Sequence, residues 1–485
     1  MGLPSPAMKL RGLICYVAMV WGVVALGCDE GSGKLDSEPG SGGNGGGAGE
    51  TGSNATAGQA GSVTCDFASA GAPPAEVHAP WDWTGVVGTG QSLAVGEQGT
   101  PVTSLTQPYN NLQLSTDDLE WPIDPNDAAL EMVPLIEPIG RHAPTYPSSW
   151  PENIASETIH SAMANQVTAL VMDLADQDYV GVHGQFGENG QCMSYLEKGA
   201  TENGVNGRAF AATLIATEAI TRLAAAEGKT YGVGAITVIH GECDAGNSRY
   251  EDDLVQLWTD YNTDIQALTG QTESIQMLVS QQNSTNDHSA STLAQWQVGV
   301  DHPDDIVCVG PTYQYASLDG THLKGDGYRL LGEKFAEVYF ERVVLGRNWQ
   351  PLQPTGVERE SARVLSLTFH VPAPPLVWDE TMEDPHPSIP EWAAGKGFEV
   401  RAGSQRLTIT SVAIVCDTVR ITVDDDLPDT GVTVSYALYG EPEFRTEPLP
   451  GMQRWGLLRD SDTFTGRSTG ESQPNFAVAF ELSVP

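Results

Sequence analysis

Three side chains with the chemistry of a nucleophilic hydrolase lie in two short segments of the sequence. Ser92 lies in Gly90-Gln91-Ser92-Leu93, while Asp319 and His322 share the stretch Asp319-Gly320-Thr321-His322. An imidazole can take the proton of a serine hydroxyl, and a nearby carboxylate can orient that imidazole and stabilise it when protonated. Each segment also has an ordinary structural explanation. The first is typical of a turn next to a strand, and the second is typical of a polar turn that caps a helix. Together they suit acyl transfer by a Ser-His-Asp triad.

Two further polar segments could complete such a site. One is Gly187-Glu188-Asn189-Gly190-Gln191-Cys192, where a glycine allows a backbone N–H to point at a developing oxyanion. The other is Ile239-His240-Gly241-Glu242-Cys243-Asp244. Each segment follows a predicted strand, and ligands of open α/β sheets gather at the carboxyl ends of strands. The serine segment is not G-x-S-x-G, so the nucleophile elbow of α/β hydrolases is not predicted.

The elements around these segments predict a three-layer α/β/α domain at residues 64–349. Short apolar runs alternate with long amphipathic stretches, which is typical of a parallel sheet covered by helices. Apolar residues recur every three or four positions over 159–174 and 254–268, which indicates helices, and Gly270 suits the end of the second. The predicted strands are 85–88, 179–183, 235–239, 275–279 and 306–309.

The pattern changes after the prolines of segment 350–354, which predict a linker. Beyond it, apolar β-rich runs separated by Gly, Asp and Pro turns predict strands at 364–371, 407–415, 419–423 and 432–439. No helical pattern of comparable strength follows. Residues 355–485 are therefore expected to form an all-β, sandwich-like module.

The sequence resembles the ordered motif blocks of SGNH hydrolases. The residues that carry this resemblance are, in order, Ser92, Gly190, the segment 240–244 and the pair Asp319 and His322. G-Q-S and H-G-E-C-D look most like the sialate O-acetylesterase and acetylxylan esterase branch of that superfamily. The resemblance covers roughly residues 86–339. It implies a flavodoxin-like domain with a five-stranded parallel sheet, and an acyl-enzyme mechanism that uses no metal and no cofactor.

The resemblance also implies a role for each catalytic residue. Ser92 is the nucleophile, His322 the general base and then the general acid, and Asp319 its orienting partner. The backbone N–H groups of Ser92 and Gly190 bind the oxyanion. His240 stands where that branch has Gln, so two roles are open to it: a third oxyanion donor, or a supporting hydrogen bond.

The remaining residues of these segments are expected to support the site. Some members of the branch rely on the acid at the position of Glu242, but Asp319 is expected to be the partner because it shares a loop with His322. Glu242, Gly241 and Gln91 then support the loops, and Asp244 and Asn247 are expected to cap the helix that begins near residue 249.

The N-terminus predicts export. Residues 1–28 have a basic region, a short apolar region and a small-residue cleavage site before Cys28, as in bacterial lipoproteins; a plain signal peptide is the alternative. Residues 29–63 are rich in Gly, Ser and Ala and are expected to be a flexible tether. Export permits disulfides, so Cys192 and Cys243 either form a bridge that links two active-site loops or remain two free buried thiols. The expected location is the periplasm or the cell exterior, with the lipid on Cys28 in the membrane.

Charge narrows the expected partners. The formal net charge of -39 disfavours nucleic acid and anionic bilayers, which require clustered Lys and Arg. Spacing of the cysteines gives no C-x-x-C pair, so no structural zinc site is expected. The resemblance to the sialate O-acetylesterase and acetylxylan esterase branch implies a serine esterase acting on acyl esters of carbohydrate, with O-acetyl as the expected group. The alternatives are a lipid or aryl esterase and a non-catalytic glycan-binding surface lipoprotein.

Overall fold

The computed structural model describes residues 65, 76–115, 120–141, 156–202, 205–206, 208–283, 288–440 and 454–485. The predicted signal peptide, the predicted lipid on Cys28 and the predicted tether lie outside these residues. Contacts join Val63–Pro485 into one compact unit, which contains both the predicted α/β domain and the predicted β module.

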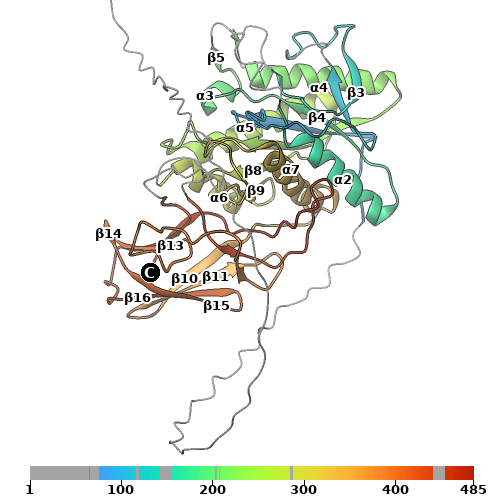
Figure 1. Cartoon of the computed structure of the whole chain (residues 1–485). Coiled ribbons are helices and arrows are strands. Elements are labelled where there is room, and N and C mark those ends of the chain that lie inside the picture. The colour runs from blue at the N-terminus through green and yellow to red at the C-terminus, as the bar shows by residue number, and fades with distance from the viewer. Residues whose placement is uncertain are drawn as a thin grey trace, which may run out of the picture. The chain divides into compact units, whose positions relative to one another are not determined.

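Within the described residues, the central sheet has seven strands in the order β3-β2-β4-β1-β7-β8-β9 (Figure 1). The strands are β1 Trp83–Gly90, β2 Leu112–Ser115, β3 Glu131–Pro134, β4 Val180–Gln185, β7 Tyr231–Ile239, β8 Gln276–Gln281 and β9 Ile306–Pro311. All are parallel to their neighbours except β3, which runs antiparallel to β2. β1 and β7 are buried along their whole length, as expected of parallel strands covered on both faces.

The sheet is larger than the five strands predicted. Those five correspond to β1, β4, β7, β8 and β9, and the additional strands β2 and β3 form one edge. Each additional strand has only four residues, and β2 meets β4 through the single pair Leu112 and Val182. Such short runs, LQLS and EMVP, are too brief to show the alternation from which strands are recognised.

Helices cover both faces of the sheet. Adjacent residues Val86 and Val87 point to opposite faces and belong to different core clusters. Val86 shares its cluster with residues of α2 and α7, whereas Val87 shares its cluster with residues of α4 and α5. α4 is long and apolar enough to cross a membrane by composition, but half of its most apolar window is buried inside the protein. The helices are α2 His160–Ala175, α3 Met193–Leu196, α4 Arg208–Ala226, α5 Tyr250–Thr269, α6 Ala290–Asp301, α7 Gly325–Tyr339 and the π-helical turn Phe340–Val344.

The described residues of the C-terminal part form two four-stranded antiparallel sheets. Their orders are β10-β11-β16-β15 and β14-β13-β17-β19. Phe369 of the first sheet packs on Phe398 of the second, with ring centroids 6.5 Å apart, so the two sheets share a core. Their strands are β10 Gln353–Ser361, β11 Val364–His370, β13 Phe398–Ala402, β14 Gln405–Arg406, β15 Ile409–Val415, β16 Thr418–Val423, β17 Val432–Tyr436 and β19 Phe480–Ser483. In the part of the chain that the structure describes, two short pairs complete the strands: β12 Val377–Trp378 with β18 Leu458–Arg459, and β5 Thr201–Glu202 with β6 Val205–Asn206.

The segment predicted as a linker is packed between the two parts. Leu352 is fully buried, and β10 begins at Gln353, whose side chain accepts a hydrogen bond of 2.8 Å from the Trp296 indole. β10 is an edge strand, a position that tolerates proline because one of its sides lacks a partner strand. Prolines here therefore mark a strand edge, and one core cluster extends through both parts.

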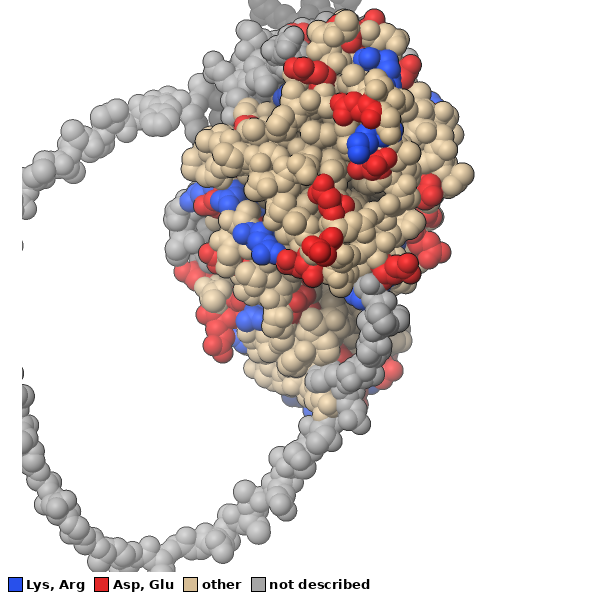
Figure 2. All heavy atoms as spheres, turned by 90° about the vertical axis from the view of Figure 1, so that its right-hand side faces the viewer, with Lys and Arg blue, Asp and Glu red and all other residues tan. Residues whose placement is uncertain are grey.

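Charge is dispersed on the face of the molecule that Figure 2 draws. On the face drawn in Figure 2, basic side chains lie next to acidic ones and form no patch of their own. This face therefore lacks the continuous positive surface that a phosphate backbone requires.

Candidate active site

His322 and Asp319 are paired on the loop between β9 and α7. Nδ1 of His322 donates to Oδ2 of Asp319 at 2.8 Å. The other carboxylate oxygen, Oδ1, accepts the backbone N–H groups of His322 and Thr321 at 2.8 and 3.0 Å. Gly320, with φ of +89°, provides the turn that brings these groups together. With the proton on Nδ1, the lone pair of Nε2 is available to act as a base.

The charges around this pair favour an ionised aspartate and a readily protonated histidine. Burial raises the pKa of Asp319, but its hydrogen bonds from His322 and Thr321 outweigh burial and lower that pKa to about 2. Burial lowers the pKa of His322, but the hydrogen bond and charge of Asp319, together with the charges of Glu97 and Glu242, raise it above its usual value. A protonated His322 imidazolium is thus stabilised.

This electrostatic balance gives a pH dependence. Because only neutral His322 can accept a proton, any reaction that uses His322 as its base is expected to slow as the pH drops through the pKa of His322, with a midpoint above the usual pKa of histidine. Asp319→Asn should move the midpoint to lower pH, since it removes the negative charge that favours the imidazolium. A pH profile of both proteins checks this, and a wild-type rate independent of pH from about 5 to 8 would contradict it.

Ser92 lies in a tight turn at the carboxyl end of β1. Gly90 ends the strand with φ of +135°, and a Cβ there would clash with the carbonyl oxygen of Ile239 on β7. The next N–H, of Gln91, donates to that same carbonyl at 3.1 Å. The carbonyl of Ser92 accepts the N–H of Glu97 at 2.9 Å, and Ser92 is 4% exposed. The backbone thus fixes the serine at the edge of the sheet where a ligand is expected.

Two residues that sequence reasoning missed connect this turn to the histidine loop. Glu97 places Oε2 3.8 Å from Nε2 of His322, and Gln98 donates from Nε2 to Oδ2 of Asp319 at 3.2 Å. The hydroxyl of Tyr328 on α7 also donates to the carbonyl of Glu97 at 2.8 Å. The turn that carries Ser92 and the loop that carries His322 are therefore neighbours. No local motif signals Glu97 or Gln98, since their role depends on the turn geometry, in which Gln98 has φ of +59°.

The loop after β4 lies against the serine turn. The N–H of Glu188 donates to the carbonyl of Gly90 at 2.8 Å, and a Cβ on Gly187 would lie 2.8 Å from that oxygen. The buried carboxylate of Glu188 forms an ion pair with Arg208 at the start of α4, which anchors the loop to that helix. Gly190 follows with φ of +71°, a conformation that favours glycine.

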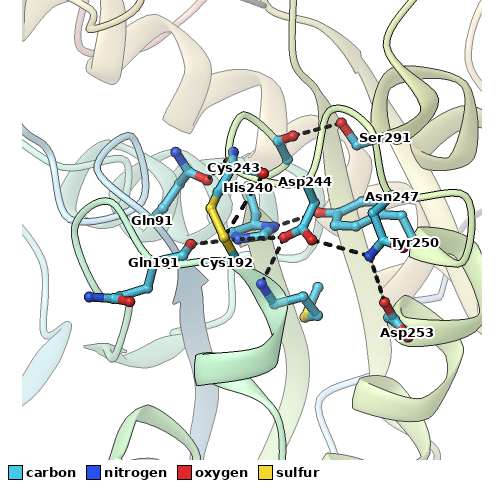
Figure 3. A network of polar contacts seen from close by, with 12 residues as sticks. Gln91, Gln191, Cys192, His240, Cys243, Asp244, Asn247, Tyr250, Asp253 and Ser291 are labelled. Carbon is cyan, nitrogen blue, oxygen red and sulfur yellow. Dashed lines mark hydrogen bonds and ion pairs between the residues drawn. A yellow bond between two sulfur atoms is a disulfide. The ribbon is translucent and has the colours of Figure 1, made fainter. Parts of the chain in front are cut away.

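His240, after β7, has both ring nitrogens engaged by the protein (Figure 3). Nε2 donates to the carbonyl of Gln191 at 3.0 Å, and Nδ1 accepts from the Tyr250 hydroxyl at 2.7 Å. Burial lowers the pKa of His240, although Asp244 opposes this, so the neutral ring is favoured. With its N–H already donated to Gln191, His240 supports the neighbouring loop, and this geometry favours the supporting role over oxyanion donation.

Covalent and polar links join the loops that follow β4 and β7. Cys192 and Cys243 form a disulfide with Cα atoms 5.0 Å apart, and Oε1 of Gln91 accepts the N–H of Cys243 at 3.3 Å. Figure 3 shows this group of residues from close by. A second disulfide joins Cys65 and Cys416. The serine turn and both loops are thus tied together on one side of the sheet.

Asp244 does not cap α5 as expected. Its Oδ2 accepts the N–H of Met193 at 2.8 Å, and its Oδ1 accepts from Asn247 at 3.1 Å. α5 begins after Arg249 with no side-chain cap. The partner on the loop after β4 is 51 positions away in sequence, so this choice depends on tertiary contact.

Gly241 and Glu242 occupy supporting positions. Gly241 has φ of +126°, and a Cβ there would lie 2.7 Å from the Gln295 side chain, so the tight turn requires glycine. Its carbonyl accepts the Ser291 hydroxyl at 2.7 Å. The charge of Glu242 raises the pKa of His322, with a smaller effect than that of Asp319.

Comparisons with known proteins identify the fold. No protein-family model matches the sequence, and no curated protein sequence matches it. The structure resembles that of a carbohydrate acetylesterase from Xanthomonas citri, with a TM-score of 0.51 at 12% identity, over 82% of this chain and 80% of that one. A protein of Arabidopsis thaliana gives a TM-score of 0.36 at 15% identity, over 54% of this chain and 99% of that one. NanS gives 0.33 at 10% identity, over 53% and 96%. The first similarity establishes a shared α/β fold.

Proposed function

We propose that this protein is a serine esterase that hydrolyses O-acetyl esters of carbohydrates. The observation that carries the proposal is the Asp319–His322 pair on a loop whose partners, Glu97 and Gln98, belong to the turn of Ser92. An ordered acid–imidazole pair next to a serine on a tight turn is the arrangement that acyl transfer requires. The fold shared with a carbohydrate acetylesterase supports the choice of substrate.

The first half of the reaction acylates the enzyme. His322 Nε2 takes the proton of the Ser92 hydroxyl as its Oγ attacks the acetyl carbonyl carbon. The tetrahedral oxyanion is bound by the backbone N–H groups of Ser92 and Gly190, where each such donor contributes about 3–4 kcal/mol to transition-state stabilisation. His322 then returns the proton to the departing sugar oxygen. Asp319 stays ionised throughout, because its pKa of about 2 lies far below neutral pH.

The second half releases acetate. A water molecule gives its proton to His322 Nε2 and attacks the acetyl group on Ser92, and the same backbone donors bind the second oxyanion. Collapse of this intermediate breaks the ester bond to Ser92 and returns the proton to its Oγ. The disulfide-linked loops hold Gly190 in place while the charge develops.

Substrate preference tests the proposal. The purified protein is expected to release acetate from acetylated xylan or from O-acetylated sialic acid, with kcat/KM at least about tenfold above that for an ester of a long-chain fatty acid. Acetate is measured by a coupled assay and fatty acid by titration. A preference for the long-chain ester would support the lipid esterase instead, and absence of hydrolysis with all substrates would support a glycan-binding protein.

A further inference from the structure

A cavity of about 690 Å³ lies where α7 meets the C-terminal segments, and the triad residues do not line it. Its wall comes from residues 314–315 after β9, from the first turns of α7, and from C-terminal segments within 379–382 and 469–476. The C-terminal segment, in dark red in Figure 1, is held on α7 by a hydrogen bond of 2.6 Å from Arg329 to the carbonyl of Ser468. The volume lies within the range of about 300–1,000 Å³ that is usual for small-ligand sites.

Three of the lining side chains each have a polar atom that is buried just beneath the cavity surface and has no hydrogen-bond partner among the described residues. These atoms are Oε1 of Gln314, Oε1 of Gln473 and Nε of Arg329. Gln473 is only 5% exposed, and its amide nitrogen donates to Glu333 at 2.9 Å, which fixes the orientation of the amide. Buried polar atoms are nearly always hydrogen-bonded, because leaving them unpaired costs free energy. Two acceptors and one donor suit a ligand with hydroxyl groups, since each hydroxyl both donates and accepts.

The charges of the lining disfavour an anionic ligand. Arg329 is paired with Asp326 at 3.0 Å, and Arg459 with Asp379 at 2.9 Å. Glu471 adds a further negative charge to the wall, and the whole chain carries a net charge of -39. Both arginines are thus neutralised by their own carboxylates, so a phosphate or a carboxylate would meet net repulsion.

Apolar side chains complete the wall. Tyr315 and Phe476 are almost fully buried yet line the cavity, and Leu330 lies beside them on α7. The small exposed part of each ring adds an apolar area to the wall, and a few placed polar groups next to it fix the orientation of a ligand. A sugar ring combines both needs, because it has apolar C–H faces and hydroxyl groups at its edge.

We propose that this cavity binds a neutral oligosaccharide segment of the substrate and so holds the glycan beside the catalytic loop. The inference rests on the proposed esterase function and adds a substrate class to it. Tyr315 and Asp326, both in the wall, bracket the loop of Asp319 and His322. Leu318 N–H donates to the carbonyl of His322 at 2.7 Å, which closes this loop at its base. A glycan held in the cavity is therefore in contact with the two ends of the catalytic loop.

Binding of unacetylated oligosaccharides to the full-length protein tests the inference, because such ligands carry no ester. Xylohexaose or mannohexaose is expected to bind at least about tenfold more tightly than hexagalacturonate by calorimetry. The bound neutral sugar should also slow hydrogen exchange of the 469–476 backbone. If neither neutral sugar binds, or the anionic one binds equally well, the inference is overturned.

A matched pair of variants locates the site. Ser472 is exposed and lines the cavity, so Ser472→Trp should fill it, weaken oligosaccharide binding at least about tenfold and raise KM for the acetylated polymer. Ser404, exposed in the turn between β13 and β14, lies outside the cavity, so Ser404→Trp should change neither quantity. Thermal unfolding checks that both variants fold. If Ser472→Trp does not fold, slower hydrogen exchange of the 469–476 backbone in the sugar-bound wild type locates the site instead. Equal binding by the two variants contradicts the inference.

The failure of this inference can be told apart from the failure of the esterase proposal. Hydrolysis of 4-nitrophenyl acetate by the wild type and by Ser404→Trp depends on the triad and needs no glycan site. If that hydrolysis is present while oligosaccharide binding is absent, only the cavity inference fails. If hydrolysis is absent, the esterase proposal fails.

Discussion

Ser92→Ala is expected to lower kcat for acetate release by about 10⁴-fold or more, because it removes the atom that forms the acyl-enzyme. The residual rate would come from binding and from the backbone oxyanion donors. Folding should not change, since the turn is held by backbone hydrogen bonds of Gln91 and Glu97 that alanine at position 92 preserves. Acetate release and thermal unfolding, measured on the same preparations, check both statements.

Ser404→Ala is a suitable control for that substitution. Ser404 is exposed in a turn of the C-terminal part and is remote in sequence from the serine turn. Its replacement should leave both activity and unfolding temperature at wild-type values. A Ser92→Ala protein that folds and retains activity within about tenfold of wild type would exclude Ser92 as the nucleophile.

Asp319→Asn is expected to lower kcat/KM by about 10³- to 10⁴-fold, whereas Glu242→Gln should lower it by no more than about tenfold. Asp319 accepts the Nδ1 hydrogen bond of His322 at 2.8 Å, which fixes the tautomer and orientation of the ring. An asparagine there can present its amide to Nδ1 and favour the wrong tautomer. Glu242 affects His322 through charge, with a smaller effect on the pKa than Asp319 has.

The comparison of these two acids decides which one is the partner of the histidine. Both substitutions remove one negative charge without changing side-chain size, so they form a matched pair. The measurement is kcat/KM for a small acetyl ester at a pH above the midpoint of the wild-type profile. The reverse order, with Glu242→Gln the more damaging, would assign the orienting role to the loop after β7.

The sequence could predict the elements that have a strong local signal. The five central parallel strands were recognisable because each is a short apolar run between amphipathic stretches, and α2 and α5 show regular helical spacing. The left-handed Gly270 at the end of α5 likewise has a local cause. The pairing of Asp319 with His322 was foreseeable because three residues separate them on one loop. The spacing of residues along the chain is therefore enough to predict these strands, helices and the Asp319–His322 pair.

Features that depend on tertiary contact were missed or wrongly assigned. Glu97 and Gln98 reach the catalytic loop from positions more than two hundred residues away, and no motif marks them. Asp244 was predicted to cap the start of α5, but it accepts the N–H of Met193 on a loop that is distant in sequence. The prolines near residue 354 indicate a break in regular structure whether they begin an edge strand or a linker. Choices of this kind require the positions of distant segments, which periodicity does not contain.

Activation of Ser92 by His322 can be tested by covalent labelling. The folded protein is incubated with a fluorophosphonate, which reacts only with an activated serine, and the modified peptide is identified by mass spectrometry. We predict one adduct, on Ser92, which forms much more slowly in His322→Ala. Labelling of a different serine would exclude Ser92 as the nucleophile, and labelling of Ser92 at the same rate without His322 would exclude His322 as its base.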